Sequence, residues 1–332
     1  MIAQPPELEE ALPQPLAHES ARPSAPEKPA ASLKRYIPLV LAVALVGYVL
    51  WRLDLNALVD AFKRTHYAAY LVFTFVFLMA LLTADAFATA YVYSKTVCPA
   101  KFRELWVIRG ASYMASVVNH HVGQGWLTYF FSKTYNAPLW RVAGATLLVY
   151  VTTFGCLFVM GAAALPFNFG RVSWLPITVA LLAVGAVVYA AVIYKAPKFL
   201  AERQATAPLV EVGLKGHVVA LLYRMPHVFV QFLGTWLPFW FFDVRVPFLD
   251  ALALIPVIML VQALPITPQG VGTRDVLALE LLAQYAPGTP EEGKAAIAAA
   301  TLSWAGALTL VQVITSLGLM RRAQAMLQRQ QP

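Results

Sequence analysis

The chain has few charged side chains and almost no cysteine. Charged residues make up 13% of its 332 residues, whereas hydrophobic residues make up 59%, so several segments exceed the roughly 20 apolar residues that cross a bilayer. The two cysteines, Cys98 and Cys156, lie beside and within apolar segments. They offer neither a disulfide framework nor the spacing of a metal site. The composition predicts an all-α polytopic membrane protein.

Motifs for ATP-driven pumping and for metal catalysis are also missing. The sequence contains no Walker A phosphate loop, HExxH or DxD pattern, so neither activity has support. His120 and His121 are adjacent rather than four positions apart on one helix face, which favours an interfacial or hydrogen-bonding role over metal ligation. We expect no metal and no cofactor. The net charge of +8 does not indicate nucleic acid, because basic residues at the cytosolic ends of membrane helices give the same sum.

Apolar segments divide the chain into a tail and a membrane domain. Residues 1–35 are rich in proline and glutamate, which predicts a disordered cytosolic tail. This tail is either a solvated spacer or a segment that recruits a partner. We expect residues 36–325 to form the transmembrane domain and residues 326–332 to form a short C-terminal tail. Residues 52–64 have the spacing of an amphipathic helix at the membrane surface. We expect about six full spans, at residues 36–51, 67–93, 142–165, 174–194, about 217–242 and 296–319. We also expect a tight turn containing Pro166 and Asn168 after the third span, and a polar loop at residues 195–216.

Two further stretches combine apolar residues with helix breakers. The stronger, residues 264–285, contains Pro265, Pro268, Gly270 and Gly272, and such interruptions at membrane depth are tolerated where they are buried in protein or line a wet cavity.

The weaker stretch, residues 119–130, contains Gly123 and Gly125. These glycines either interrupt the helix or only allow close packing of helices. We interpret residues 102–132 and 247 to about 285 as re-entrant helical hairpins. Interruptions at corresponding places in two halves, about 36–165 and 174–319, predict inverted repeats around a binding site.

The positions of lysine and arginine predict the orientation. With the N-terminus in the cytosol and each hairpin returning to its side of entry, sixteen basic residues fall inside and six outside. Three are intramembrane: Arg109, Arg224 and Arg274. This asymmetry predicts that both termini are cytoplasmic.

Candidate site residues follow from the two interruptions. Arg274 lies in the first turn of a predicted half-helix, where the guanidinium and the helix N-terminus together would hold a phosphate. Asp275 lies beside it, and the alternative is that this acid only caps the helix or fixes the arginine. The intramembrane carboxylates of Asp85 and Glu280 are candidates for proton coupling, or paired structural groups. The candidate substrate-binding residues are Arg109, Asn119, His120, His121, Gly123, Gln124, Gly125, Gln269, Gly270, Gly272, Thr273, Arg274 and Asp275.

The stretch from Pro265 to Asp275 resembles the P-x-x-x-G-G-x-G-x-R-E signature of the lysylphosphatidylglycerol synthase transmembrane (flippase-like) family, with Asp275 in place of the usual Glu. Residues 119–125, a stretch ending at Pro138 and a D-L-x-x-L pattern beginning at Asp54 are similar to other motifs of that family. The first motif lacks the family's Pro-Gly-Arg, and Trp126 stands where the family has an acidic residue. The resemblance covers roughly residues 33–325.

The resemblance implies that the protein moves a lipid with an anionic or glycosylated headgroup between leaflets of the inner membrane. Phospholipids, polyprenyl-phosphate-linked glycans and hopanoid-type lipids are the classes it suggests. The soluble domain that transfers an aminoacyl group in the two-part synthases is expected to be missing. Two alternatives stay open: an integral-membrane headgroup transferase, and a scaffold for a lipid-modifying enzyme.

Overall fold

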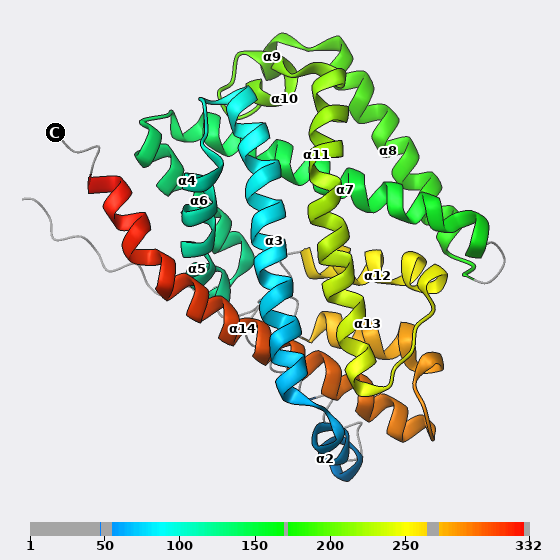
Figure 1. The fold of residues 1–332 in the computed structure, drawn as a ribbon. Helices are drawn as coiled ribbons and strands as arrows, with labels where there is room; N and C mark the ends of the chain where they lie inside the picture. The colour runs from blue at the N-terminus through cyan, green and yellow to red at the C-terminus, as the bar shows by residue number, and fades with distance from the viewer. Residues whose placement is uncertain (1–46, 48–54, 169–171, 264–271, 329–332) are drawn as a thin grey trace, which may run out of the picture. The chain divides into compact units, whose positions relative to one another are not determined.

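The computed structural model describes residue 47 and residues 55–168, 172–263 and 272–328, which form helices and turns without a strand. The predicted tail at residues 1–35 lies outside this part, and so does the predicted first span at residues 36–51 except Gly47. Five helical segments are long and apolar enough to cross a membrane (Figure 1). They are α3 (Tyr67–Thr96), α7 (Leu139–Asn168), α8 (Leu175–Lys195), α11 (Gly213–Trp236) continued by the 3-10 helix η2 (Leu237–Phe242), and α14 (Pro290–Gln328).

Each of the five overlaps one of the other predicted spans, and most of the helices extend a few residues beyond the predicted bounds. The helix α7 continues through Pro166 to Asn168 where a turn was expected, and α14 continues past residue 319 to Gln328. Two short helices, α9 (Lys198–Ala201) and α10 (Ala207–Glu211), occupy the predicted polar loop between α8 and α11. The described protein is therefore a multi-span helical membrane protein.

The helix α8 has a surface that is apolar and mostly exposed. It buries only Leu175 and Ile193, while Ile177, Leu181 and Val187 are each more than 60% exposed. A helix that is apolar all round does not tolerate such exposure to water, so this surface suits lipid.

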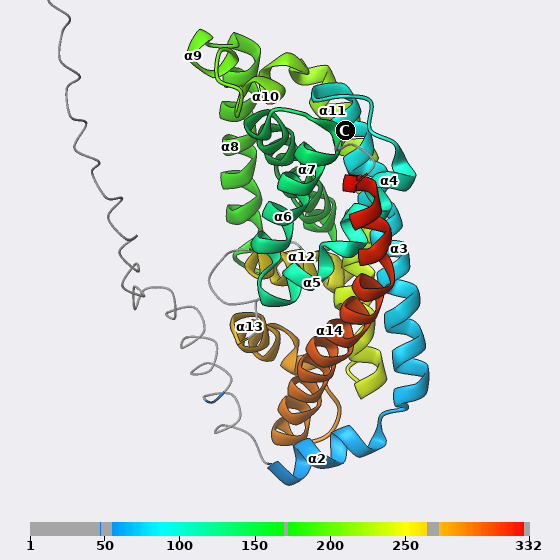
Figure 2. The same cartoon turned by 90° about the vertical axis from the view of Figure 1, so that its left-hand side faces the viewer.

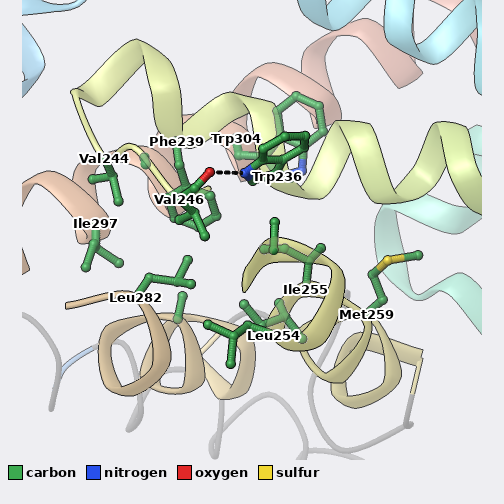
Figure 3. Packing of buried hydrophobic residues seen from close by; sticks show 14 of the residues in the cluster. Trp236, Phe239, Val244, Val246, Leu254, Ile255, Met259, Leu282, Ile297 and Trp304 are labelled. Atoms are coloured by element: carbon green, nitrogen blue, oxygen red, sulfur yellow. Dashed lines mark hydrogen bonds between the residues drawn. The ribbon is translucent and has the colours of Figure 1, made fainter. Parts of the chain in front are cut away.

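A hydrophobic core is formed mainly by the second half of the chain, together with residues of α3 and α7 (Figure 3). The Trp236 indole N–H donates a hydrogen bond to the Val246 carbonyl oxygen at 3.1 Å, which ties the end of α11 to the turn before α12 (Phe248–Ala263). Around this contact lie Phe239, Leu254, Ile255, Leu282, Ile297 and Trp304. The core thus holds α12, α13 (Thr273–Leu282) and α14 together beside α11.

The first predicted hairpin consists of α4 (Phe102–Ala111), α5 (Tyr113–Val118) and α6 (His120–Tyr135), and its two ends meet. The Tyr135 hydroxyl donates to Glu104 at 2.6 Å and accepts from the Lys101 backbone N–H at 3.2 Å. Figure 2 shows α14 passing along this hairpin towards α2 (Leu55–Arg64). At the break between α4 and α5, the Ser316 hydroxyl of α14 donates to the Ala111 carbonyl and accepts from the Met114 N–H.

The ends of the second predicted hairpin also meet. The Arg245 N–H, before α12, donates to the carbonyl oxygen of Tyr285 at 3.2 Å, and Tyr285 ends the 3-10 helix η4 (Ala283–Tyr285) after α13. Residues 264–271, which connect α12 to α13, lie outside the described residues. Both segments therefore return to their starting points, as a re-entrant hairpin requires, while re-entry into a bilayer stays a prediction.

The interruption in the first hairpin does not occur at the glycines. Asn119 has extended backbone between α5 and α6, and its side chain accepts a hydrogen bond from the His121 N–H at 2.8 Å, as an N-cap. Gly123 and Gly125 lie inside α6. A Cβ built on Gly123 would overlap the Ser116 side chain of α5, whereas Gly125 faces open space. The packing interpretation is therefore the correct one for Gly123.

We expect Gly123→Ala to destabilise the protein by about 1–3 kcal/mol, because the added methyl group forces α5 and α6 apart. Gly125→Ala is the matched control, and it should be neutral or stabilising by up to about 1 kcal/mol, because alanine favours a helix more than glycine. Melting temperatures of the two purified variants test this. Equal melting temperatures would show that the approach of α5 and α6 is not tight.

Candidate functional site

A polar cavity of about 170 Å³ lies among the membrane helices. Residues from α3, α4, α5, α6, α7, α11, α12 and α14 line it, so both halves of the chain contribute. Most of its lining residues carry polar side chains, and apolar residues such as Phe77, Leu81 and Val149 complete the wall. The polar side chains are Asp85, Arg109, Tyr113, Ser116, His120, Gln124, Tyr150, Thr153, Arg224, His227, Gln231, Thr235, Gln262 and Gln312.

An ion cluster of one carboxylate and two guanidinium groups forms part of the wall. Asp85 Oδ2 accepts from Arg109 Nε at 2.5 Å, and Asp85 Oδ1 accepts from Arg224 Nη1 at 2.5 Å. The three side chains come from α3, α4 and α11 and are at most 9% exposed. The cluster therefore ties three helices together and carries one unit of positive charge in excess.

Neutral side chains complete part of the cluster. Arg224 Nη2 donates to the Thr89 hydroxyl at 2.9 Å, and Arg109 Nη1 donates to the Gln124 amide oxygen at 3.1 Å. Other polar atoms of the lining have no hydrogen-bond partner among the described residues. They are Arg224 Nε, His227 Nδ1 and Gln312 Oε1.

The first interrupted stretch contributes to this cavity. His120 and Gln124 of α6 line it, together with Ser116 of α5. His121 is not among the lining residues, and its Nδ1 lies 3.4 Å from the Tyr150 hydroxyl. Asn119 serves as the helix cap described above. Of the predicted substrate-binding residues in this half, the structure brings together Arg109, His120 and Gln124.

The second interrupted stretch begins at the cavity wall. Gln262 and Ala263, the last lining residues of α12, directly precede residues 264–271, so the predicted site residues Gln269 and Gly270 lie outside the described part. Beyond this gap, Gly272 has a φ of +87°, in the region that favours glycine, and its N–H donates to Asp275 Oδ2 at 2.9 Å. Thr273 then starts α13.

Arg274 is held by protein groups. Its Nε and Nη2 donate to Asp275 Oδ1 at 3.1 and 2.9 Å, and Nη2 also donates to the Thr301 carbonyl oxygen of α14 at 3.0 Å. Among the described residues, Arg274 lines a cavity of about 10 Å³, which is too small for a phosphate group. Thr235 and Trp304 line both this space and the polar cavity. Binding of a headgroup at Arg274 stays a prediction.

The two predicted proton-coupling residues have different surroundings. Asp85 is buried between two arginines, whereas Glu280 is exposed on α13. Proton coupling by either residue stays a prediction. In the described ranges, no group of three or more His, Cys, Asp and Glu side chains is placed to hold a metal ion.

Sequence reasoning missed the role of Arg224 in the cavity. It identified Arg224 as an intramembrane arginine but gave it no partner, because Asp85 lies 139 positions away. His227, Gln231 and Gln312 were missed as well. The available signal was the spacing of Arg224, His227 and Gln231 by three and four positions, which places them along one face of α11.

These features define a helical integral membrane protein with a buried, positively charged polar cavity. Residues 36–319 match the family model described as the lysylphosphatidylglycerol synthase TM region. The chain therefore belongs to this family, and a lipid-related function in the membrane follows. No curated protein and no solved structure matches the chain.

We expect Arg274→Gln to lower the free energy of unfolding by roughly 3–5 kcal/mol, because Asp275 is then buried without its cation. Arg274→Lys should be milder, since it keeps the charge but loses the planar fork that reaches both Asp275 and Thr301. Arg321→Gln, on an exposed part of α14, is the matched control. Melting temperatures and folded yield measure the effect. Lost lipid movement with an unchanged melting temperature would instead support headgroup binding at Arg274.

Proposed function

We propose that the protein moves a lipid with an anionic or glycosylated headgroup between the leaflets of the inner membrane. The lipid headgroup occupies the polar cavity during transfer. Both termini face the cytoplasm in this proposal, as the distribution of lysine and arginine predicts. The observation that carries the proposal is the buried polar cavity with its excess positive charge.

The cavity suits a headgroup better than an acyl chain. Its lining includes two arginines and four glutamines, whose polar groups would be left without partners by a hydrocarbon. Phe154 of α7 lines the cavity and is also 39% exposed, so an apolar ring lies between the polar interior and the outside of the bundle. Acyl chains can remain in the bilayer beside this ring while the headgroup enters.

The excess charge favours an anionic headgroup. Moving an uncompensated charge from water into a protein interior costs several kcal/mol even after relaxation. A phosphate beside Arg109 and Arg224 offsets that cost and gains charge-assisted hydrogen bonds. The family membership supports a lipid as the source of the phosphate.

A headgroup transferase is the second candidate, because the same cavity could hold a lipid for chemistry. The two functions leave different products. Transfer or release of a headgroup by the purified protein in detergent supports an enzyme, whereas exchange between leaflets in vesicles containing only this protein supports a flippase. Exchange that requires an added lipid-modifying enzyme supports the scaffold.

We expect the purified protein to move fluorescent phosphatidylglycerol between leaflets of protein-only vesicles, measured by loss of fluorescence to an impermeant quencher. Arg109→Gln should slow this movement at least tenfold, because the cavity loses its excess positive charge while Asp85 keeps Arg224 as a partner. Arg103→Gln is the matched control on the same helix, since Arg103 is exposed. Equal rates for the wild type, Arg109→Gln and empty vesicles would reject the proposed function.

A further inference from the structure

The ion cluster is not balanced by the described protein. Asp85 supplies one negative charge to the two guanidinium groups of Arg109 and Arg224, and the lining side chains among the described residues include no second carboxylate. Buried charges are normally paired. The cluster therefore has one excess positive charge, which an anion would neutralise.

The atoms without partners show what else that anion should carry. Arg224 Nε is a donor and requires an acceptor, such as a phosphate oxygen. Gln312 Oε1 is an acceptor and requires an O–H or N–H donor. Arg224 is 1% exposed and Gln312 is 9% exposed, and neither atom has a hydrogen-bond partner among the described residues.

The two side chains enclose the same cavity from different helices. Arg224 belongs to α11 and Gln312 to α14. Each unpaired buried polar atom costs about 1–3 kcal/mol, so a ligand that pairs both binds more tightly than one that pairs only the first. Both atoms are buried in this structure, so a ligand that pairs them requires the two side chains to turn towards the cavity.

We infer that Arg224 and Gln312 form a two-point site for a phosphate whose substituent carries a hydroxyl group, such as a phosphate-linked polyol or sugar. The phosphate binds to Arg224, and the hydroxyl donates to Gln312. This inference rests on the proposed function for the view that the phosphate belongs to a lipid. It goes further by assigning two residues to headgroup selection.

Equilibrium binding tests the inference separately from transport. The full chain is purified in a polyoxyethylene detergent, which carries neither phosphate nor sugar, and its melting temperature is measured with added short-chain lipids. Phosphatidylglycerol and phosphatidylmethanol have the same charge and differ in the hydroxyl groups. Phosphatidylcholine supplies a neutral lipid, and glycerol phosphate supplies the same headgroup chemistry without acyl chains.

We expect wild-type protein to bind phosphatidylglycerol about five- to tenfold more tightly than phosphatidylmethanol, as one added hydrogen bond predicts, and phosphatidylcholine more weakly than either. Gln312→Leu should abolish the preference for the hydroxyl group and keep binding of both anionic lipids. Gln324→Leu, exposed on the same helix, should change nothing. Arg224→Gln should lose at least tenfold in affinity for both anionic lipids. Binding of glycerol phosphate as tight as that of phosphatidylglycerol would identify a free solute as the ligand.

Equal affinity for phosphatidylglycerol and phosphatidylmethanol in the wild type would overturn the inference, even if Arg224→Gln failed to fold. An unchanged preference in Gln312→Leu would also overturn it. If binding follows these expectations but no lipid moves in vesicles, the proposed transport is wrong and the binding site stands. If lipid moves without the hydroxyl preference, the transport proposal stands and the two-point site is wrong.

Discussion

Asp85 is the residue on which the interior of the membrane domain depends, because it accepts hydrogen bonds from arginines on two other helices. The contacts to Arg109 and Arg224 join α3, α4 and α11. Hydrogen bonds from Trp106 to Thr83 and from Arg224 to Thr89 add to these connections. In a membrane, packing between apolar surfaces gains little from the hydrophobic effect, so buried polar contacts contribute more to specificity. One carboxylate can hold both arginines in place, but it cannot neutralise both. The same cluster thus positions helices and leaves a positive charge for a ligand.

The two interrupted stretches support this cavity in different ways. In the first, polar side chains on both sides of Asn119 reach the cavity, and Ser316 satisfies backbone groups that the break leaves open. In the second, α12 ends at the cavity wall, while Arg274 and Asp275 fasten the start of α13 to α14. A short hydrogen-bonded contact closes each segment at its ends. Both segments therefore contribute described residues to the cavity wall, and the Arg274–Asp275 pair fastens α13 to α14.

Local patterns predicted the long helices because an apolar run of membrane length has few other structures open to it. The apolar residues of 142–165 and 174–194 were sufficient to place α7 and α8, although Pro166 does not end α7 where a turn was expected. Glycine was ambiguous, since the same residue permits a break or a close contact, and only the position of Ser116 distinguishes these for Gly123. The ion cluster could not be predicted, because no local pattern connects Asp85 to Arg224 across 139 positions.

The cavity carries excess positive charge, and we propose that an anionic lipid neutralises it. The most direct test is the rise in melting temperature that phosphatidylglycerol causes in Asp85→Asn compared with the wild type. Removing the carboxylate leaves two buried guanidinium groups without their partner, so the variant should be less stable in neutral detergent and should gain more from the lipid than the wild type does. A lipid-induced rise that is equal to or smaller than that of the wild type would contradict the account.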